Sequence, residues 1–317
     1  MNNYTKTFRL LITLIWISMF ALLFAANGNA QSSGIDLKSS VFTFKRPVGA
    51  GAAASNTVYK KKSQLAVRKR ENKTIKSSGA TSATSKPTAE QLGVTLWRLR
   101  PEKSGDTGAR LLTMKGSGQD SAKMVADRVK IDTVFQKGEK VRLSVESPNS
   151  GYLYIIDREM RTDGSVGDAY LIFPTLTTSG GNNKVTAGKL IEIPSQTDDP
   201  FYFDITPTEK NYAGELLTFM ISPTKIEGLE LTNGPLKLPS SLVDKWETMW
   251  EGKSTTYELD GKGRDLSYTE EEKEAGIGSR LLTQKSPAPQ TLITVDASKG
   301  KPFLVSIPMK VSKQEPK

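Results

Sequence analysis

The chain has 317 residues, with 44 lysine and arginine side chains against 34 aspartate and glutamate side chains, and it contains no histidine and no cysteine. The missing cysteines exclude disulfide bonds, thiolate nucleophiles and zinc–sulfur sites, and the missing histidines exclude Ser-His-Asp relays and imidazole metal ligands. Carboxylates, lysine, tyrosine, serine, threonine and oxygen-ligand metals such as calcium remain available for chemistry.

The first 30 residues have the organisation of a secretory signal peptide. Lys6 and Arg9 form a basic start, residues 10–26 are almost entirely apolar, and the small residues Gly28 and Ala30 follow. The apolar run of 17 residues is short for a bilayer span. We therefore predict cleavage after residue 30 and export to the periplasm or the outside, with an uncleaved membrane anchor as the alternative. No later segment approaches spanning length, so we expect no transmembrane span in the mature chain.

Residues 31–91 are predicted to form a disordered basic arm. They are rich in Ser, Ala, Gly, Thr and Lys and carry a net charge of +9, whereas residues 92–317 are close to neutral at −1. We interpret the arm as a tether, with contact between residues 60–76 and an anionic surface as a secondary role. Only Tyr59 is interleaved with the charges, so specific nucleic-acid recognition is not expected. The residues predicted for the polyanion contact are Lys60, Lys61, Lys62, Arg68, Lys69 and Arg70.

The remaining chain, residues 92–317, is predicted to fold as one mainly β domain. Short β-branched and aromatic segments alternate with turn residues, which indicates an antiparallel β-sandwich-like arrangement with one or two short helices in the C-terminal part. We expect the last two strands to return to the main sheets. The predicted strands are residues 94–99, 141–145, 152–156, 170–173, 189–193, 201–205, 216–221, 291–296 and 303–309.

One helix is well signalled near residue 241. Ser241 and Asp244 fit the Ser-x-x-acid capping pattern, and Gly252 is placed to end the helix. We expect its apolar stripe to dock on a sheet, with a two-tryptophan carbohydrate platform as the alternative. A second, short acidic helix is predicted from Thr269. The stripe consists of Leu242, Val243, Trp246, Met249 and Trp250.

Five segments together resemble a bacterial exported family known only as a domain of unknown function. The resemblance implies an exported, β-rich domain and supplies no catalytic residues or ligand. The segments are GVTLWRLRP (93–101), GEKVRLSVESPNSGYLYIIDRE (138–159), TDGSVGDAYLIFPT (162–175), GGNNKVTAGKLIEIP (180–194) and PAPQTLITV (287–295).

Four carboxylates gather around the turn dipeptide Asp163–Gly164 and form a candidate acidic loop. Calcium needs several converging oxygens, but the spacing departs from that of a calcium loop, and Arg158 and Arg161 supply opposite charge. We therefore expect a solvated, salt-bridged hairpin, and calcium binding stays open. The loop consists of Asp157, Glu159, Asp163 and Asp168.

A second candidate site is an aromatic face made by Tyr152, Tyr154 and Tyr170. Strand alternation places Tyr152 and Tyr154 on one face and Leu153 on the other. An exposed face of this kind could hold a glycan or an extended peptide. The alternative, which we expect, is that the rings belong to the core and hydrogen-bond at its margin.

No cofactor site, metal site or catalytic constellation is predicted. We expect an exported, non-catalytic binding domain for an unidentified envelope protein or polymer, kept near the cell envelope by the basic arm. The alternatives are a carboxylate-dependent hydrolase with its acids on the 157–168 loop, and a structural envelope component whose sheet edges recruit other chains.

Overall fold

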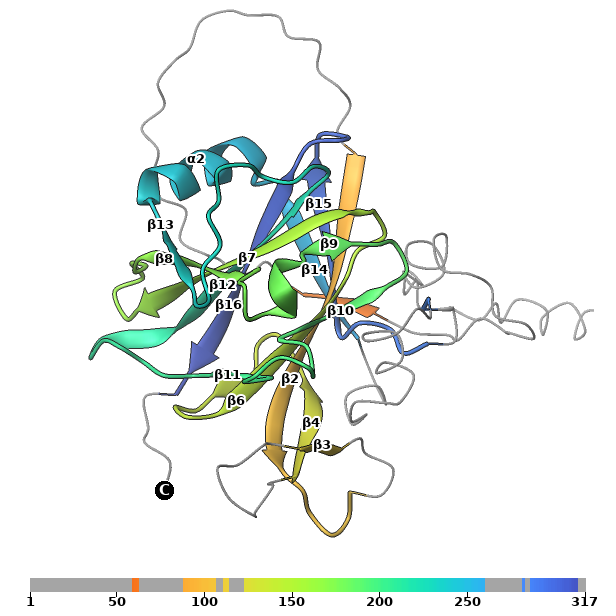
Figure 1. Cartoon of the computed structure of the whole chain (residues 1–317), viewed down its shortest axis with the longest axis vertical. Coiled ribbons are helices and arrows are strands. Elements are labelled where there is room, and N and C mark those ends of the chain that lie inside the picture. The colour runs from red at the N-terminus through yellow and green to blue at the C-terminus, as the bar shows by residue number, and fades with distance from the viewer. Residues whose placement is uncertain are drawn as a thin grey trace, which may run out of the picture. The chain divides into compact units, whose positions relative to one another are not determined.

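The computed structural model describes residues 59–62, 88–106, 111–113, 123–259, 281–282 and 286–312. All of them lie in one of the two compact units of the chain, Asp36–Lys317. They form two β-sheets and one α-helix, as Figure 1 shows. The predicted mainly β, largely antiparallel architecture is confirmed.

The first sheet contains nine strands, and all its pairs are antiparallel. Its longest strand, β2, pairs along one edge with β15 and then β4, and along the other edge with β6, which also carries β10 and β11. The strands are β1 (Tyr59–Lys61), β2 (Thr88–Pro101), β3 (Leu111–Thr113), β4 (Lys123–Val129), β6 (Lys140–Glu146), β10 (Leu190–Ile193), β11 (Phe203–Asp204), β14 (Ser254–Leu259) and β15 (Thr291–Ala297).

The second sheet contains seven strands in the order β13-β8-β7-β12-β16-β5, with β9 beside β7. Its pairs are antiparallel except for β5 with β16, which is parallel. The last two strands of the chain, β15 and β16, return to the two sheets as expected. The strands are β5 (Val134–Phe135), β7 (Gly151–Arg161), β8 (Ala169–Phe173), β9 (Lys184–Val185), β12 (Tyr212–Ser222), β13 (Leu236–Leu238) and β16 (Phe303–Val311).

An apolar layer between the sheets forms the main core. Successive side chains of a strand point to opposite faces, so each strand contributes alternate residues to this layer. The strand β6 contributes Val141, Leu143 and Val145 to the layer. Its alternate residues Arg142 and Ser144 are buried as well, so neither face of β6 is open to solvent as strict alternation would suggest. The second sheet faces the first with a matching set from β7, β8, β12 and β16, which includes Leu153, Ile155, Phe173, Leu217, Phe219, Ile221, Val305 and Ile307.

The outer face of the second sheet is covered by the helix α2 (Ser240–Trp250), seen above β8 and β13 in Figure 1. Trp246 is 5% exposed and packs in the cluster that contains Tyr154, which supports docking and leaves no open tryptophan platform. Met249 is 52% exposed and does not join the buried stripe. The predicted Ser241 cap is wrong: Ser241 lies within the helix, its N-cap residue is Pro239, and no described side chain caps it.

Two parts of the predicted disordered arm, residues 59–61 and 88–91, form strands. Residues 59–61 form strand β1, which pairs with β14, and β2 already begins at Thr88. Lys62 forms an ion pair with Asp132 at 2.5 Å, because the short edge strand brings it next to the turn before β5. The predicted signal peptide, most of the predicted arm and the helix predicted from Thr269 lie outside the described residues. None of the helices that the structure describes is long and apolar enough to cross a membrane.

Gly214 marks a bulge in β12, where the register with β7 shifts between Tyr212 and Gly214. Its φ is +147°, and a Cβ atom there would lie 2.0 Å from the Met309 carbonyl oxygen on β16. The strand can pass β16 this closely only because the residue has no side chain.

We expect Gly214→Ala to lower the free energy of unfolding by about 2 kcal/mol or more, because backbone atoms must move apart. Urea denaturation measures this. Gly234→Ala is the control, since a Cβ there meets nothing within 4 Å, and it should change stability by less than about 0.5 kcal/mol. Equal stability of the two variants would contradict the close approach.

Candidate functional site

The predicted acidic loop is the β7–β8 hairpin, and its four carboxylates do not converge. Asp157 and Glu159 lie within β7, whereas Asp163 lies at the turn, where its Oδ1 accepts the Ser165 N–H at 2.8 Å. Asp168 lies just before β8 and receives a hydrogen bond from Lys237 Nζ at 2.5 Å. Within the described ranges, no three acidic side chains are grouped as metal ligands would be.

Ion pairs hold this hairpin to its neighbours. Arg161 donates to both carboxylate oxygens of Glu209, at 2.5 and 2.8 Å, and its Nη1 donates to the Val166 carbonyl oxygen at 3.0 Å. On the other face of β7, Arg158 is 8% exposed and pairs with Glu247 of α2. These arginines supply the opposite charge that their positions in the sequence suggested.

Asp157 joins a second carboxyl group that the sequence analysis missed. In the β7–β12 ladder, Asp157 lies opposite Leu217 and Glu159 lies opposite Glu215. Asp157 and Glu215 are therefore diagonal neighbours on one face of the ladder, and each carboxyl group affects the pKa of the other. Tyr212 completes the cluster, because its hydroxyl group donates to Glu215 Oε1 at 2.6 Å. We call Asp157, Glu215 and Tyr212 the acid cluster.

Burial governs the protonation of the acid cluster. Desolvation raises the pKa of Asp157 to about 7 and the pKa of Glu215 to about 8, and their mutual repulsion adds to the effect at Glu215. The negative charge of Glu159 acts in the same direction on both. Burial and the adjacent Glu215 also raise the pKa of Tyr212 well above its usual value. The cluster therefore retains at least one proton under conditions in which isolated carboxyl groups are ionised.

Glu159 is hydrogen-bonded to Thr208 and does not belong to the acid cluster. Its two oxygens accept the Thr208 N–H at 2.9 Å and the Thr208 hydroxyl at 2.8 Å. Together with Arg161 and Glu209, this contact fastens the segment 205–211 to the end of β7. Glu159 is thus an anchor for the chain that enters β12.

The three tyrosines of the predicted aromatic face do not share a surface. Tyr154 is 2% exposed, lies beneath α2 and accepts the Ile226 N–H on its hydroxyl oxygen at 2.7 Å. Tyr152 lies on the same side of the sheet and is half-buried against the same cluster. Tyr170 is 38% exposed and alternates with Ala169 and Leu171, which are buried beneath α2, so its ring lies on the opposite face.

A pocket of about 250 Å³ lies between the hairpin and the start of α2. Arg158 and Arg161 line it from β7, and Ser240 and Asp244 line it from the helix. Arg158 Nε is shielded from solvent and has no hydrogen-bond acceptor in the described part of the chain. The other charges at the wall are largely matched, since Arg161 pairs with Glu209 and Asp168 with Lys237 outside the pocket.

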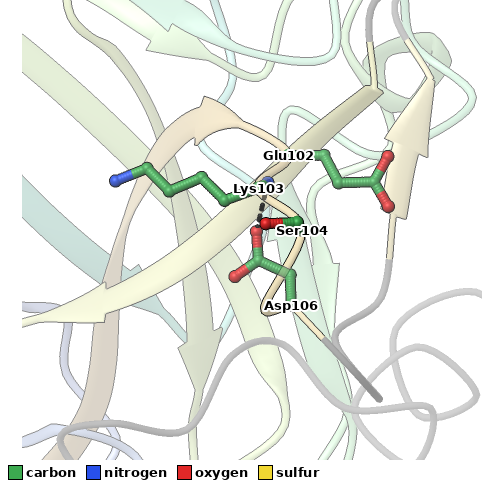
Figure 2. A pocket seen from close by; sticks show the side chains of 4 residues that line it. All are labelled: Glu102, Lys103, Ser104 and Asp106. Atoms are coloured by element: carbon green, nitrogen blue, oxygen red, sulfur yellow. Dashed lines mark hydrogen bonds between the residues drawn. The ribbon is translucent and has the colours of Figure 1, made fainter.

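A second surface pocket, of about 350 Å³, lies at the turn after β2 and is shown in Figure 2. Its wall consists of Glu102, Lys103, Ser104 and Asp106. Asp106 accepts the Lys103 N–H at 2.7 Å, and both of its oxygens accept from Arg100 at 2.7 Å. The Arg100 guanidinium lowers the pKa of Asp106 to about 2. Because its carboxylate is already engaged, Asp106 has the role of a turn anchor.

The first sheet also contains a buried ion pair that no sequence motif indicated. Arg142 Nη2 donates to Glu192 Oε2 at 3.0 Å and to the Pro194 carbonyl oxygen at 2.9 Å, and both charged side chains are buried. Burial lowers the pKa of Arg142, and the charge of Glu192 opposes that shift. The pair fixes β10 and the following chain on β6.

Comparison with known proteins gives one match. The model of a family described as a domain of unknown function (DUF4384) matches residues 134–223. A DUF4384 domain is thus found in this part of the chain. It runs from β5 to β12, contributes strands to both sheets and contains the whole acid cluster. Three of the five resembling segments lie within the matched range, and two lie outside it. No match was found among curated proteins or among solved structures.

The members of the acid cluster outside the hairpin left only a weak signal in the sequence. Glu215 stands next to the apolar run of residues 216–221, where an acid on the inward face is unusual. Its distance of 58 residues from Asp157 hides the contact, because only strand pairing brings β7 and β12 together. Asp204 and Glu192, two other acids of the chain, lie on strands of the first sheet.

We expect Glu192→Gln to lower the free energy of unfolding by about 3 kcal/mol, because it leaves a buried guanidinium without its carboxylate. The double variant Arg142→Met with Glu192→Leu removes both charges and should recover most of that loss. Urea denaturation of the wild type, the single variant and the double variant measures these differences in the free energy of unfolding. A double variant less stable than the single one would contradict the explanation by charge burial.

Proposed function

We propose that the chain is an exported, non-catalytic binding domain that recognises a partner at the pocket beside α2 and is kept near anionic envelope material by its basic arm. The observation that carries the proposal is the pocket itself, whose wall combines Arg158 and Arg161 with the start of α2. Guanidinium groups form strong hydrogen bonds with carboxylate oxygens.

The helix beside the pocket favours the same kind of ligand. Ser240 is the first residue of α2, and no described side chain caps this end of the helix. The N–H groups of a first helical turn attract carbonyl or carboxylate oxygens. Since Arg158 is already paired with Glu247, the pocket favours one polar acceptor group of a partner over a free polyanion.

The positions of the carboxyl groups support binding over hydrolysis. A glycosidase-type site needs two acids that face a substrate cleft. Asp157 and Glu215 touch each other and line neither of the two pockets described above. For hydrolysis, a substrate would need a cleft that reaches these two carboxyl groups.

The pocket can be tested with two matched variants of α2. Ser240→Glu places a carboxylate at the pocket wall, and Ser241→Glu places one in the same helical turn without lining the pocket. Both charges suit the helix dipole, so neither should destabilise the fold. We expect Ser240→Glu to weaken retention on a washed envelope fraction at high salt by about tenfold, which corresponds to about 1.4 kcal/mol, and Ser241→Glu to leave it unchanged. Equal retention of both variants would contradict the pocket as the binding site.

The arm is tested separately by its charge. Replacing Arg68, Lys69 and Arg70 with glutamine leaves β1 and the Lys62–Asp132 ion pair in place. If the arm contacts a polyanion, the triple variant should lose retention at low salt and behave like the wild type at high salt, where such contacts are screened. Unchanged retention at low salt would show that the arm is a tether only.

A further inference from the structure

Asp157 and Glu215 occupy diagonal positions on one face of the β7–β12 ladder. Leu217, which lies opposite Asp157, belongs to the apolar layer between the sheets, so both carboxyl groups lie on the inward face at the end of that layer. Diagonal neighbours on one face of an antiparallel pair lie within reach of each other. The position explains why two acids from distant parts of the chain are in contact.

The hydrogen bonds of the cluster require a proton between the two acids. Tyr212 occupies Glu215 Oε1. Asp157 Oδ1 and Glu215 Oε2 are both shielded from solvent and meet no other donor in the described residues. An ionised carboxylate is only an acceptor, so two ionised groups would leave both oxygens without a donor. One shared proton, donated by the Glu215 carboxylic acid to Asp157, satisfies both.

Among the described residues, no positively charged side chain beside Asp157 and Glu215 replaces that proton. The charged and titratable groups that act on the pair are Arg158 and Glu159 on β7 and Tyr212 on β12. Arg158 is committed to Glu247 on the other face, and Glu159 adds a third negative charge. From the neighbouring strand β16, Met309 lies opposite Glu215 and contributes none.

We propose that Asp157 and Glu215 form a pH-operated clamp, which holds the start of β12 on β7 while the shared proton is bound and loosens it when the proton leaves. The pair adjoins the Tyr212–Gly214 bulge, where the ladder is irregular. The segment before the bulge is fastened to β7 beside the pair, through Glu159 with Thr208 and Arg161 with Glu209. When the proton leaves, two adjacent, half-buried negative charges therefore repel each other beside the least regular part of the β7–β12 ladder.

Carboxyl-carbon NMR titration of the purified protein tests the shared proton directly. We expect the signals of Asp157 and Glu215 to titrate together in two steps around and above neutral pH, and the signal of Asp163 to titrate at acidic pH. In Glu215→Gln the remaining Asp157 should titrate in a single step, since its acidic neighbour is gone. Independent titration of Asp157 and Glu215 near pH 4 in the wild type would overturn the proposal.

The clamp also predicts a pH dependence of stability. The folded protein keeps a proton that the unfolded chain has released, so the stabilisation is complete at acidic pH and declines as the pH rises from about 4 to about 8. We expect the melting temperature of the wild type to fall by about 5 °C more between pH 5 and pH 9 than that of Asp157→Asn or Glu215→Gln. Asp168→Asn is the control, since its carboxylate is exposed and paired with Lys237, and it should follow the wild type.

Amide hydrogen exchange, corrected for the intrinsic effect of pH, locates the loosening. In the wild type, the corrected exchange rate of residues 208–216 should be higher at pH 9 than at pH 6. In Asp157→Asn, the rates at the two pH values should be equal. An increase of the same size in both proteins, or one spread evenly over the sheet, would overturn the clamp even if both variants fold normally.

Discussion

The apolar layer between the two sheets is the constraint on which the other features of this protein depend. Each strand that crosses it must present apolar residues at every second position. β7 does so with Leu153 and Ile155, and the same alternation then brings Asp157 and Glu159 to the inward face where the layer ends. The intervening residues, among them Tyr154 and Arg158, are directed towards α2. Through its period of two, this one strand thus contributes residues to the core, to the acid cluster and to the pocket wall.

The charged groups at the margins of the core are satisfied in three ways. Arg142 and Glu192 form a buried pair that also uses a carbonyl oxygen. Arg158 and Arg161 pair with Glu247 and Glu209 on neighbouring elements. The acid cluster holds two groups of the same sign, and a proton is the only partner available to both among the described residues. Each arrangement avoids an isolated buried charge, which would cost several kcal/mol.

The DUF4384 match covers the part of the chain in which these arrangements meet. It includes β6 and β10 of the first sheet and β7, β8 and β12 of the second. The strands outside it, such as β2, β15 and β16, extend both sheets and complete the apolar layer. The matched segment supplies the clamp and much of the pocket wall, while α2, which closes the pocket, lies after the matched range.

Local sequence determined the class of the fold. Alternation in residues 141–145 and the apolar run of residues 216–221 predicted strands, and the turn at Asp163–Gly164 predicted the β7–β8 hairpin, because these signals depend on neighbouring residues. The arginines of the hairpin also indicated its ion pairs. The predicted strand at 201–205 was too long, since only Phe203–Asp204 pairs with β6. The predicted Ser241 cap failed because Pro239 occupies the N-cap position and α2 begins at Ser240, so Ser241 lies inside the helix.

Only the tertiary structure decided which distant residues meet. Strand pairing joins Asp157 to Glu215, and Arg142 to Glu192, across about 50 residues or more, and no local pattern specifies such a pairing. Strand β1 was also not predictable from local sequence. Its three residues look like part of a polar arm, and only their pairing with the edge strand β14 makes them a strand. The composition determined that the chemistry of this chain uses neither histidine nor cysteine, which leaves carboxylates, lysine, tyrosine, serine and threonine. The pairing of β7 with β12 decided that two carboxylates, Asp157 and Glu215, lie side by side and shielded from solvent, because contact and burial are properties of the assembled sheets.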